Sequence, residues 1–437
     1  MIFPLILTIL SLFTHLLFFG QPYAVVFDEV YNGSFISAYY SGEYYFDIHP
    51  PLAKILMKFA GDIINIPYNV DFGSIGNELP LSFVLLRILP LLAGVMLPIV
   101  IYFICRHINF SKTVSFAVGL LIILENSLLV HSRFILFDSM MIFFGFSAIL
   151  LYLIYSKQEN RRYLVWFSAI LASLACGIKW TGFAFPLFII LYEIYRVKDF
   201  RKVIKMLAVY AVIGLIIYIS IFAIHFSYLK YTGKGSDFMT DRFQKTLIYS
   251  AYYDNQNVEP RGFFGKFMEL NYKMYEANNT LTATHDYASK WYTWPFMIRS
   301  VFYFQDIEEG RYIYLLGNPL IYLLGTFSII LLIRSLFRKG IDKKVITFIS
   351  LGYLVNFIPF IFIGRVMFLY HYEAALVFSI IAIGYWLDSI DTEKKKAVAA
   401  TIILASTLLF IYFSPLTYGR SLTKEELKSR MWLSTWR

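Results

Sequence analysis

The chain has 437 residues, of which 58% are hydrophobic and only 16% are charged, and its formal net charge is +10. A soluble fold of this length does not need so much apolar surface, and repeated apolar runs of close to 20 residues indicate a polytopic membrane protein. The positive charge falls mostly in short loops between those runs. Membrane orientation therefore accounts for it, and nucleic acid is not the expected partner.

Eleven apolar runs are predicted to be membrane-spanning helices. They cover residues 2–19, 82–105, 113–129, 134–155, 163–178, 180–195, 203–225, 312–333, 345–363, 366–387 and 397–413. The stretch 163–195 is too long for one helix, and Gly177, Lys179 and Gly182 predict a tight turn within it. We expect one polytopic, all-α membrane domain over residues 1–437.

Lys and Arg cluster in five short loops, which the positive-inside rule assigns to the cytoplasm. These loops are 106–112, 157–162, 196–205, 334–344 and 394–396. The N-terminus is then cytoplasmic, and two long segments, 20–81 and 226–311, face the outside. Each is predicted to hold an amphipathic helix lying on the membrane. The expected apolar faces are Leu52, Ile55, Leu56, Phe59 and Ile63, with Lys54 and Lys58 opposite, and Phe263, Phe267, Leu270 and Met274.

Adjacent carboxylates, Asp28 and Glu29, follow the first apolar run by about nine residues. The simplest interpretation is that Asp28 caps a helix that begins at Glu29. A catalytic interpretation is compatible with capping, because a carboxylate at a helix N-terminus is well fixed in space. We therefore treat the segment around this pair as the centre of a site hypothesis.

Further ionisable residues gather near the outer ends of the spans. They include Asp47, His49, Arg87, Glu125, His131, Arg133, Asp138, Lys179, His285, Lys290, Arg299, Arg365 and His371. Snorkelling or a structural ion pair explains most single cases, but charges at membrane depth are costly and here come from many separate turns. Cations suit a lipid phosphate, and a carboxylate suits a general base. Without a Gly-rich phosphate loop, a nucleotide donor is not expected.

At these residues the chain resembles the protein O-mannosyltransferase family. The first-loop sequence VFDEVYNGSFISAYYSGEYYFDIHPPLAK is similar to the family's Asp-Glu and His-Pro-Pro-Leu-Ala-Lys signature. ENSLLVHSRFILFDSMMIFF, GIKWTGF, ATHDYASKWYTWPFMIR, GNPLIY and RVMFLYHYEAAL resemble later motifs in the same order, nearly end to end.

The resemblance implies the GT-C glycosyltransferase fold and a polyprenyl- or dolichyl-phosphate mannose donor. It further implies inverting transfer of mannose to Ser or Thr of translocated proteins, with no metal and no other cofactor. Asp28 matches the catalytic position and Arg87 a donor-phosphate position. Lys179, Arg133 and Arg365 are further phosphate candidates. Glu29 is expected to orient the acceptor backbone or a neighbouring cation, and His49 the acceptor; Asp138, His371, His285 and Trp294 support the site.

Two departures from the family pattern stand out. Phe18 occupies a position where the family usually carries Arg, and segment 226–311 is too short for the β-trefoil MIR domain of eukaryotic members. We therefore expect a prokaryotic plasma-membrane protein, or an ER protein in a eukaryote, active on the external or luminal face. A dimer is left open. The alternatives are a GT-C transferase with another sugar or a glycan or lipid acceptor, and, more remotely, a transporter.

Overall fold

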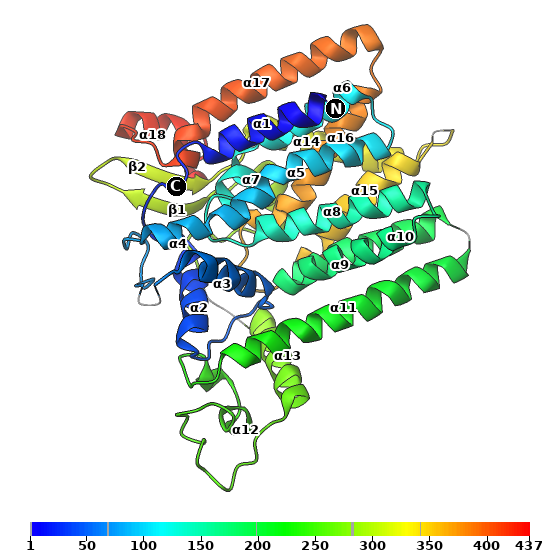
Figure 1. Cartoon of the computed structure of the whole chain (residues 1–437). Helices are drawn as coiled ribbons and strands as arrows, with labels where there is room; N and C mark the ends of the chain where they lie inside the picture. Colours follow the sequence, from blue (N-terminus) through cyan, green and yellow to red (C-terminus); the bar gives the residue numbers. More distant parts are fainter. Residues whose placement is uncertain (1, 68–69, 198, 281–283, 341) are drawn as a thin grey trace.

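The computed structural model describes residues 2–67, 70–197, 199–280, 284–340 and 342–437. Long helices run side by side across the molecule (Figure 1). One layer is formed by α5 (Ile88–His107), α8 (Asp138–Lys157), α9 (Tyr163–Ile178), α10 (Ala184–Arg196) and α11 (Phe200–Tyr228). The turn predicted inside 163–195 is confirmed, because α9 ends at Ile178 and a short 3-10 turn, Trp180–Phe183, leads into α10.

The second half of the bundle is organised around α16 (Glu373–Asp388), where nearly every residue is buried. It packs against α6 (Lys112–Ile123), α14 (Pro319–Ser335) and α15 (Lys344–Phe357). The outer members of this half are α1 (Ile2–Leu16) and α17 (Thr392–Tyr418), which expose apolar side chains such as Leu5, Phe13, Leu404 and Leu408. A helix that is apolar on its outer face as well as its inner one is suited to lipid.

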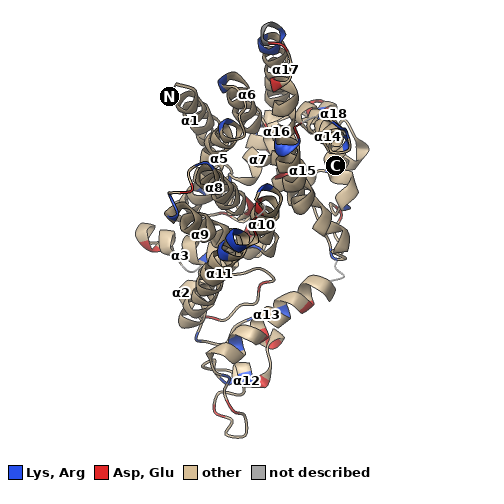
Figure 2. Ribbon diagram, turned by 90° about the vertical axis from the view of Figure 1, so that its right-hand side faces the viewer, with Lys and Arg blue, Asp and Glu red and all other residues tan. Residues whose placement is uncertain are grey.

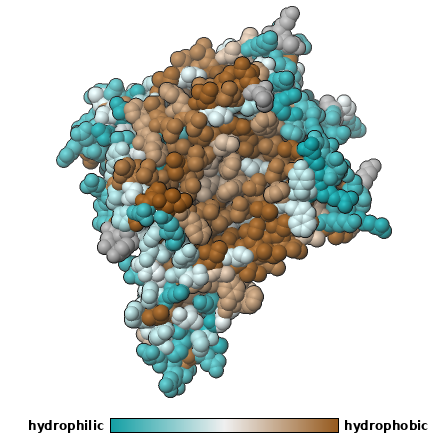
Figure 3. Space-filling model, in the orientation of Figure 1, coloured by the Kyte–Doolittle hydropathy of each residue, from teal (hydrophilic) through white to brown (hydrophobic). Residues whose placement is uncertain are grey.

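A broad apolar band crosses the molecule between two hydrophilic ends (Figure 3). Within the described part of the chain, five helices are long and apolar enough to cross a membrane: Leu81–His107, Asp138–Lys157, Phe200–Tyr228, Lys344–Phe362 and Lys394–Tyr418. Helical structure occupies each of the eleven predicted spans. The count of eleven membrane crossings stays a prediction.

The five basic loops all lie at one end of the bundle, at the right in Figure 1, and Figure 2 looks onto that end with the ribbon coloured blue at Lys and Arg. Of the basic residues in these loops, Lys198 lies outside the described part of the chain. The two long segments, 20–81 and 226–311, lie at the opposite end with α2 (Glu29–Ser41), α3 (Leu52–Ile64), α4 (Leu81–Leu86), α12 (Asp241–Gln244) and α13 (Phe263–Thr280). Charge is therefore segregated along the bundle axis, as the sequence predicts.

Both amphipathic helices exist, but their faces differ from the prediction. In α3, Leu52 and Ile55 are buried, whereas Phe59 and Ile63 are exposed. Lys54, expected on the polar face, is buried and forms an ion pair with Asp47. In α13 the predicted stripe packs inward, with Phe263 against Phe226 of α11. The exposed stripe is instead formed by Phe264, Met268, Tyr272 and Tyr275.

An antiparallel hairpin, β1 (Val301–Asp306) and β2 (Arg311–Leu315), is absent from the all-α prediction. The eighth predicted span begins at residue 312, whereas α14 begins at Pro319 behind the N-cap Asn318. Aromatic and β-branched residues fill both strands and favour extended pairing. Gly310, with φ of +63°, occurs in the connecting turn. The backbone carbonyl of Tyr303 accepts a 3.0 Å hydrogen bond from Phe27 N–H, which ties the hairpin to the first long segment.

Candidate active site

Asp28 occupies the N-cap position of α2, as predicted, yet its side chain makes no capping hydrogen bond. Its backbone is already helical (φ −68°, ψ 0°), and the residue is half-buried. None of the side-chain hydrogen bonds or ion pairs found in the described residues involves this carboxylate. The simple capping interpretation therefore does not account for Asp28, and the group is available for chemistry.

Glu29 points the other way and is fully buried. Oε1 accepts hydrogen bonds from Arg87 Nε at 2.8 Å and Ile135 N at 2.9 Å. Oε2 accepts from Arg87 Nη2 at 2.7 Å and Val26 N at 2.9 Å. Glu29 thus joins the first long segment, α5 and the turn before α8. Of the two roles expected for Glu29, orienting a neighbouring cation agrees with its bonds to Arg87, whereas the enclosed, fully bonded carboxylate does not support a direct contact with the acceptor.

Arg87, the residue between α4 and α5, is equally enclosed. Besides Glu29, its guanidinium donates to the carbonyls of Gly20, Pro22 and Ala24 at 2.7–2.8 Å. These bonds engage all five N–H groups of the side chain. Arg87 therefore has no donor left for a phosphate, and its predicted phosphate contact does not fit the structure.

Arg133 is also committed elsewhere. Its guanidinium donates to the carbonyls of His15, Leu17 and Phe18 at 2.7–2.9 Å, and it stacks over the Tyr418 ring. These carbonyls follow or end α1, where helical acceptors have no partner within the helix. The group therefore caps the outer end of α1, and its predicted role at the phosphate is not supported.

Lys179 and Asp138 do lie together. Lys179, directly after α9, donates from Nζ to Asp138 Oδ2 at 2.6 Å, and its side chain is 14% exposed. The ammonium also lies 5.3 Å from the centroid of the Tyr370 ring. Because Asp138 is the first residue of α8, the carboxylate also benefits from the helix N-terminus. A partly exposed ammonium held by one carboxylate keeps N–H groups for a further anion.

Arg365 is the second cation with free donors. Its only hydrogen bond in the described structure is a long one, 3.4 Å, to the carbonyl of the adjacent Val366, and its buried Nε has no partner there. Burial raises the pKa of Asp28 to about 6, while the charges of Lys179 and Arg365 lower it. The charges of both cations act on this carboxylate, which makes Lys179 and Arg365 candidates for one site with Asp28.

His49 belongs to the same cluster. Burial and the positive charges of Lys179, Arg365 and Lys54 hold the pKa of His49 well below its usual range, so the ring is neutral. Asp47 accepts from His49 N and pairs with Lys54. A neutral imidazole can donate to or accept from a substrate hydroxyl.

The three aromatic and histidine supports divide into two groups. His371 stacks on Trp294 with ring centroids 5.8 Å apart, and Trp294 is buried and donates to Ser289. His285 is exposed and contacts Phe368 edge-on at 5.0 Å. Of these three, His371 lines a small cavity together with Asp138 and Tyr370. Trp294 therefore supports His371 from behind.

Next to the small cavity lies an open apolar groove of about 720 Å³ between α9, α10, α11 and the end of α15. Four residues line both hollows: Thr181, Ala184, Val355 and Pro359. The polar site is therefore adjacent to an open apolar groove. The groove walls are formed by small and apolar side chains, including Ala172, Leu187, Leu207, Ala211, Gly214 and Leu215.

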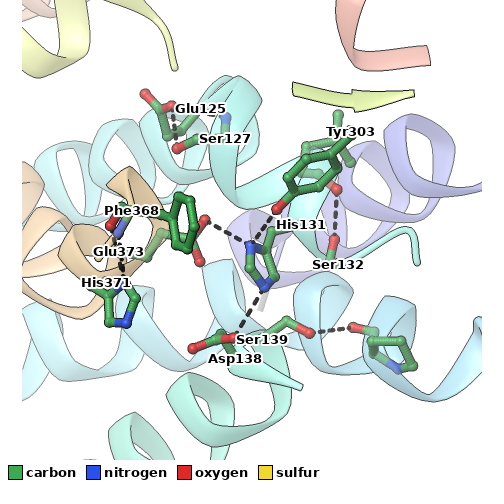
Figure 4. Close-up of polar contacts among 12 residues, drawn as sticks. Glu125, Ser127, His131, Ser132, Asp138, Ser139, Tyr303, Phe368, His371 and Glu373 are labelled. Atoms are coloured by element: carbon green, nitrogen blue, oxygen red, sulfur yellow. Dashed lines mark hydrogen bonds and ion pairs between the residues drawn. The ribbon is translucent and has the colours of Figure 1, made fainter. Parts of the chain in front are cut away.

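Sequence reasoning missed three groups next to these residues. Tyr303 lies in the unpredicted hairpin, and no sequence signal marks it. Glu373 is a fully enclosed carboxylate at the start of α16, and its place in an otherwise apolar run is a signal that was available. His131 was noted but given no role. Figure 4 shows these three residues meeting near Asp138.

Similarity to solved structures defines the fold. The S. cerevisiae protein O-mannosyltransferase Pmt1-Pmt2 complex bound to the sugar donor contains a chain that matches with a TM-score of 0.90 at 20% identity, covering 100% of this chain and 92% of that one. ArnT from Cupriavidus metallidurans, bound to undecaprenyl phosphate, matches with a TM-score of 0.55 at 15% identity, covering 94% and 64%. The protein has the GT-C glycosyltransferase fold.

Sequence comparison gives the family. The family model described as dolichyl-phosphate-mannose-protein mannosyltransferase matches residues 5–230, and that of the C-terminal four TMM region of protein-O-mannosyltransferase matches residues 263–436. The chain belongs to the protein O-mannosyltransferase family.

Two curated relatives show how far the similarity extends. Dolichyl-phosphate-mannose--protein mannosyltransferase 1 of S. cerevisiae is 22% identical over 95% of this chain and 80% of its own length. Protein O-mannosyl-transferase 1 of Danio rerio is 31% identical, over 56% of this chain and 36% of its own length. The latter match therefore spans about a third of the relative's length.

Proposed function

We propose that the protein transfers mannose from a polyprenyl- or dolichyl-phosphate mannose to Ser or Thr hydroxyls of translocated proteins, with inversion at the anomeric carbon. The observation that carries the proposal is the unengaged carboxylate of Asp28 beside two cations with free donors, Lys179 and Arg365. A base next to a phosphate-sized cationic site is what transfer from a lipid phosphate to a hydroxyl needs.

In this mechanism Asp28 accepts the proton of the acceptor hydroxyl as its oxygen attacks the anomeric carbon. The bond to the phosphate oxygen breaks on the opposite face of the sugar. Lys179 and Arg365 stabilise the negative charge that develops on the leaving phosphate. Phosphate leaves without protonation, so one carboxylate suffices, in contrast to the acid and base pair of inverting glycosidases. Neutral His49 holds the acceptor hydroxyl or a sugar hydroxyl in place.

The polyprenyl chain of the donor is assigned to the apolar groove. The groove adjoins the cavity at Asp138 and His371, and its walls are nearly free of polar groups. The chain moves there from an equally apolar bilayer, so the groove would hold it by van der Waals packing rather than by removing it from water. With the phosphate at Lys179 and Arg365, the sugar then points toward Asp28.

We infer the orientation from the segregation of charge. The five basic loops face the cytoplasm, and the site end faces the outside of a plasma membrane, or the lumen if the source is eukaryotic. The protein is proposed to act as a single polytopic domain whose outer segments, 20–81 and 226–311, carry acceptor contacts. A homodimer is compatible with this arrangement, because the site residues named above all come from one chain.

The test is transfer by purified protein in nanodiscs, with mannosyl-phospho-polyprenol and a Ser/Thr-rich peptide, against the same peptide with Ala at those positions. Glucosyl and aminosugar donors, and a lipid-linked glycan acceptor, are run in parallel. Asp28→Asn should lower turnover at least about 100-fold with little effect on donor binding. Glu43→Gln, which changes an exposed carboxylate of the same segment, is the matched control. If transfer occurs only from one of the other donors, the sugar of that donor takes the place of mannose in the proposal.

A further inference from the structure

His131 lies at the end of α7 (Asn126–His131) with its ring almost completely buried. Figure 4 shows the imidazole between two partners that come from different elements. Its Nε2 lies 3.1 Å from Asp138 Oδ2, and its Nδ1 lies 3.0 Å from the Tyr303 hydroxyl. Glu373 Oε1 is 3.5 Å from Nδ1 and has no hydrogen-bond partner in the described structure.

The partners define where the protons are. Asp138 Oδ2 already accepts from Lys179, so it acts as an ionised acceptor toward His131. Nε2 therefore carries the hydrogen, and Nδ1 accepts from the Tyr303 hydroxyl. In this tautomer the ring is neutral and each nitrogen has one partner.

Each partner leads to one half of the proposed reaction. On one side, Asp138 holds Lys179, which is proposed to contact the donor phosphate. On the other side, the Tyr303 ring stacks on Phe27 with centroids 4.5 Å apart and planes 8° apart. Phe27 N–H also donates to the Tyr303 carbonyl, and Phe27, at φ of +46°, directly precedes Asp28. A non-glycine residue held at positive φ needs its surroundings to fix it.

We propose that His131 is a positioning residue that sets the phosphate-binding ammonium of Lys179 and the catalytic carboxylate of Asp28 at a fixed separation. The inference rests on the proposed mannosyl transfer. His131 acts through two separable hydrogen bonds. The bond to Asp138 fixes the ammonium of Lys179, and the bond from Tyr303 fixes the loop that carries Asp28. A misplacement of about 1 Å between reacting groups can lower a rate about 100-fold.

Two substitutions separate the two bonds. The amide of a Gln side chain reaches the place of Nε2, so His131→Gln keeps a donor for Asp138 and loses the acceptor for Tyr303. The amide of Asn reaches the place of Nδ1, so His131→Asn keeps the Tyr303 contact and loses Asp138. Removing one hydrogen bond corresponds to about a tenfold effect. We expect His131→Gln to lower kcat about tenfold at unchanged donor KM, and His131→Asn to raise donor KM about tenfold.

Tyr303→Phe keeps the ring stacked on Phe27 and removes only the hydroxyl. It should lower kcat about as much as His131→Gln, and the double variant should be no worse than either single one, because both remove the same bond. Equal losses of kcat and donor affinity in both His131 variants, or wild-type kcat in Tyr303→Phe, would overturn the inference. Tyr303→Phe also decides the matter if the His131 variants fail to fold. Wild-type protein inactive with every mannosyl donor overturns the proposed function, and this inference with it.

Discussion

Glu29 and Arg87 form a bidentate ion pair in which neither side chain reaches solvent. Arg87 Nε donates to Glu29 Oε1 at 2.8 Å, and Arg87 Nη2 donates to Oε2 at 2.7 Å. Glu29 directly follows the catalytic candidate Asp28 in sequence, but the pair belongs to the framework of the protein. Every donor of the guanidinium and both carboxylate oxygens are bonded inside the protein. Its loss therefore affects folding before it affects substrate binding.

Arg87→Ala should destabilise the protein by about 3–5 kcal/mol, because Glu29 is left as an unpaired buried charge. Arg87→Lys should not restore stability, since an ammonium cannot replace five planar donors. Thermal unfolding in detergent, followed by size-exclusion chromatography, measures the loss. Lys202→Ala, which removes an exposed pair with Glu159, is the control and should change stability by less than about 1 kcal/mol. Arg87→Ala that folds like wild type and only weakens donor binding would restore its phosphate role.

Turnover should rise with pH through about 6 and then level off. The pKa of Asp28 is raised from its ordinary 3.8 to about 6, chiefly by burial, and the group is a base only when ionised. Folding favours the neutral carboxyl, so the stability it contributes at low pH is lost as pH rises through 6. Asp28→Asn cannot ionise and so avoids this loss of stability, and the variant should be at least as stable as wild type at pH 7. A single-turnover pH profile measures the first effect, and a flat profile between pH 5 and 7 would assign the base to another group.

Arg365→Gln should raise the KM for the donor about tenfold or more, since a charge-assisted bond to phosphate contributes roughly 1.5–3 kcal/mol. The native guanidinium makes only one long internal bond in the described structure, so stability should change little. Donor titration against intrinsic fluorescence and steady-state kinetics provide the measurement. Lys290→Gln, at an exposed cation of the other long segment, is the control. Equal donor KM in both variants would remove Arg365 from the phosphate site.

Filling the groove should discriminate between donors by chain length. A side chain at Gly214 would meet only Ser173 Oγ, at 3.6 Å, so Gly214→Phe can enter the groove without a clash at its base. We expect a higher KM for long-chain mannosyl-phospho-polyprenol and little change for a short, water-soluble analogue. Ile411→Phe, on the exposed face of α17, is the matched control. If the short and long donors were affected equally, the chain would bind elsewhere.

The orientation can be tested by cysteine labelling. Both native cysteines, Cys105 and Cys176, are buried, so their background reactivity should be low. Cysteines introduced at Asp71 and Asn255 should react with a membrane-impermeant maleimide in intact cells, and one at Lys396 should react only after permeabilisation. Labelling of all three from the same side would contradict the two-sided arrangement of charge.

Local patterns predicted the helices well. Gly177 and Gly182 marked the break between α9 and α10 because glycine and a charged residue interrupt an apolar run. Lys179 and Asp28 were found because each stands out from its neighbours by charge and position. Such signals are contained within a few residues, and so they can be read from sequence.

The tertiary contact that each charged side chain makes could not be predicted in the same way. Glu29 and Arg87 are 58 residues apart, and nothing in either segment distinguishes a buried carboxylate from a catalytic one. Periodicity placed Lys54 on a solvated face, whereas Asp47 stabilises it in the interior. The hairpin was missed because aromatic strands have the same hydropathy as the start of a span. In each case the tertiary partner decides, and a single sequence does not identify it.

The groove between α10 and α11 opens sideways, with Leu187, Leu207 and Leu215 about half exposed along its rim. A long isoprenoid can then enter and leave by lateral diffusion and never has to be extracted from the bilayer. The spent carrier leaves through the same opening by which the next donor enters, so the two lipids compete for the groove. With the donor chain in the proposed groove, we expect transfer to depend on the surface density of both charged and discharged carrier in the membrane.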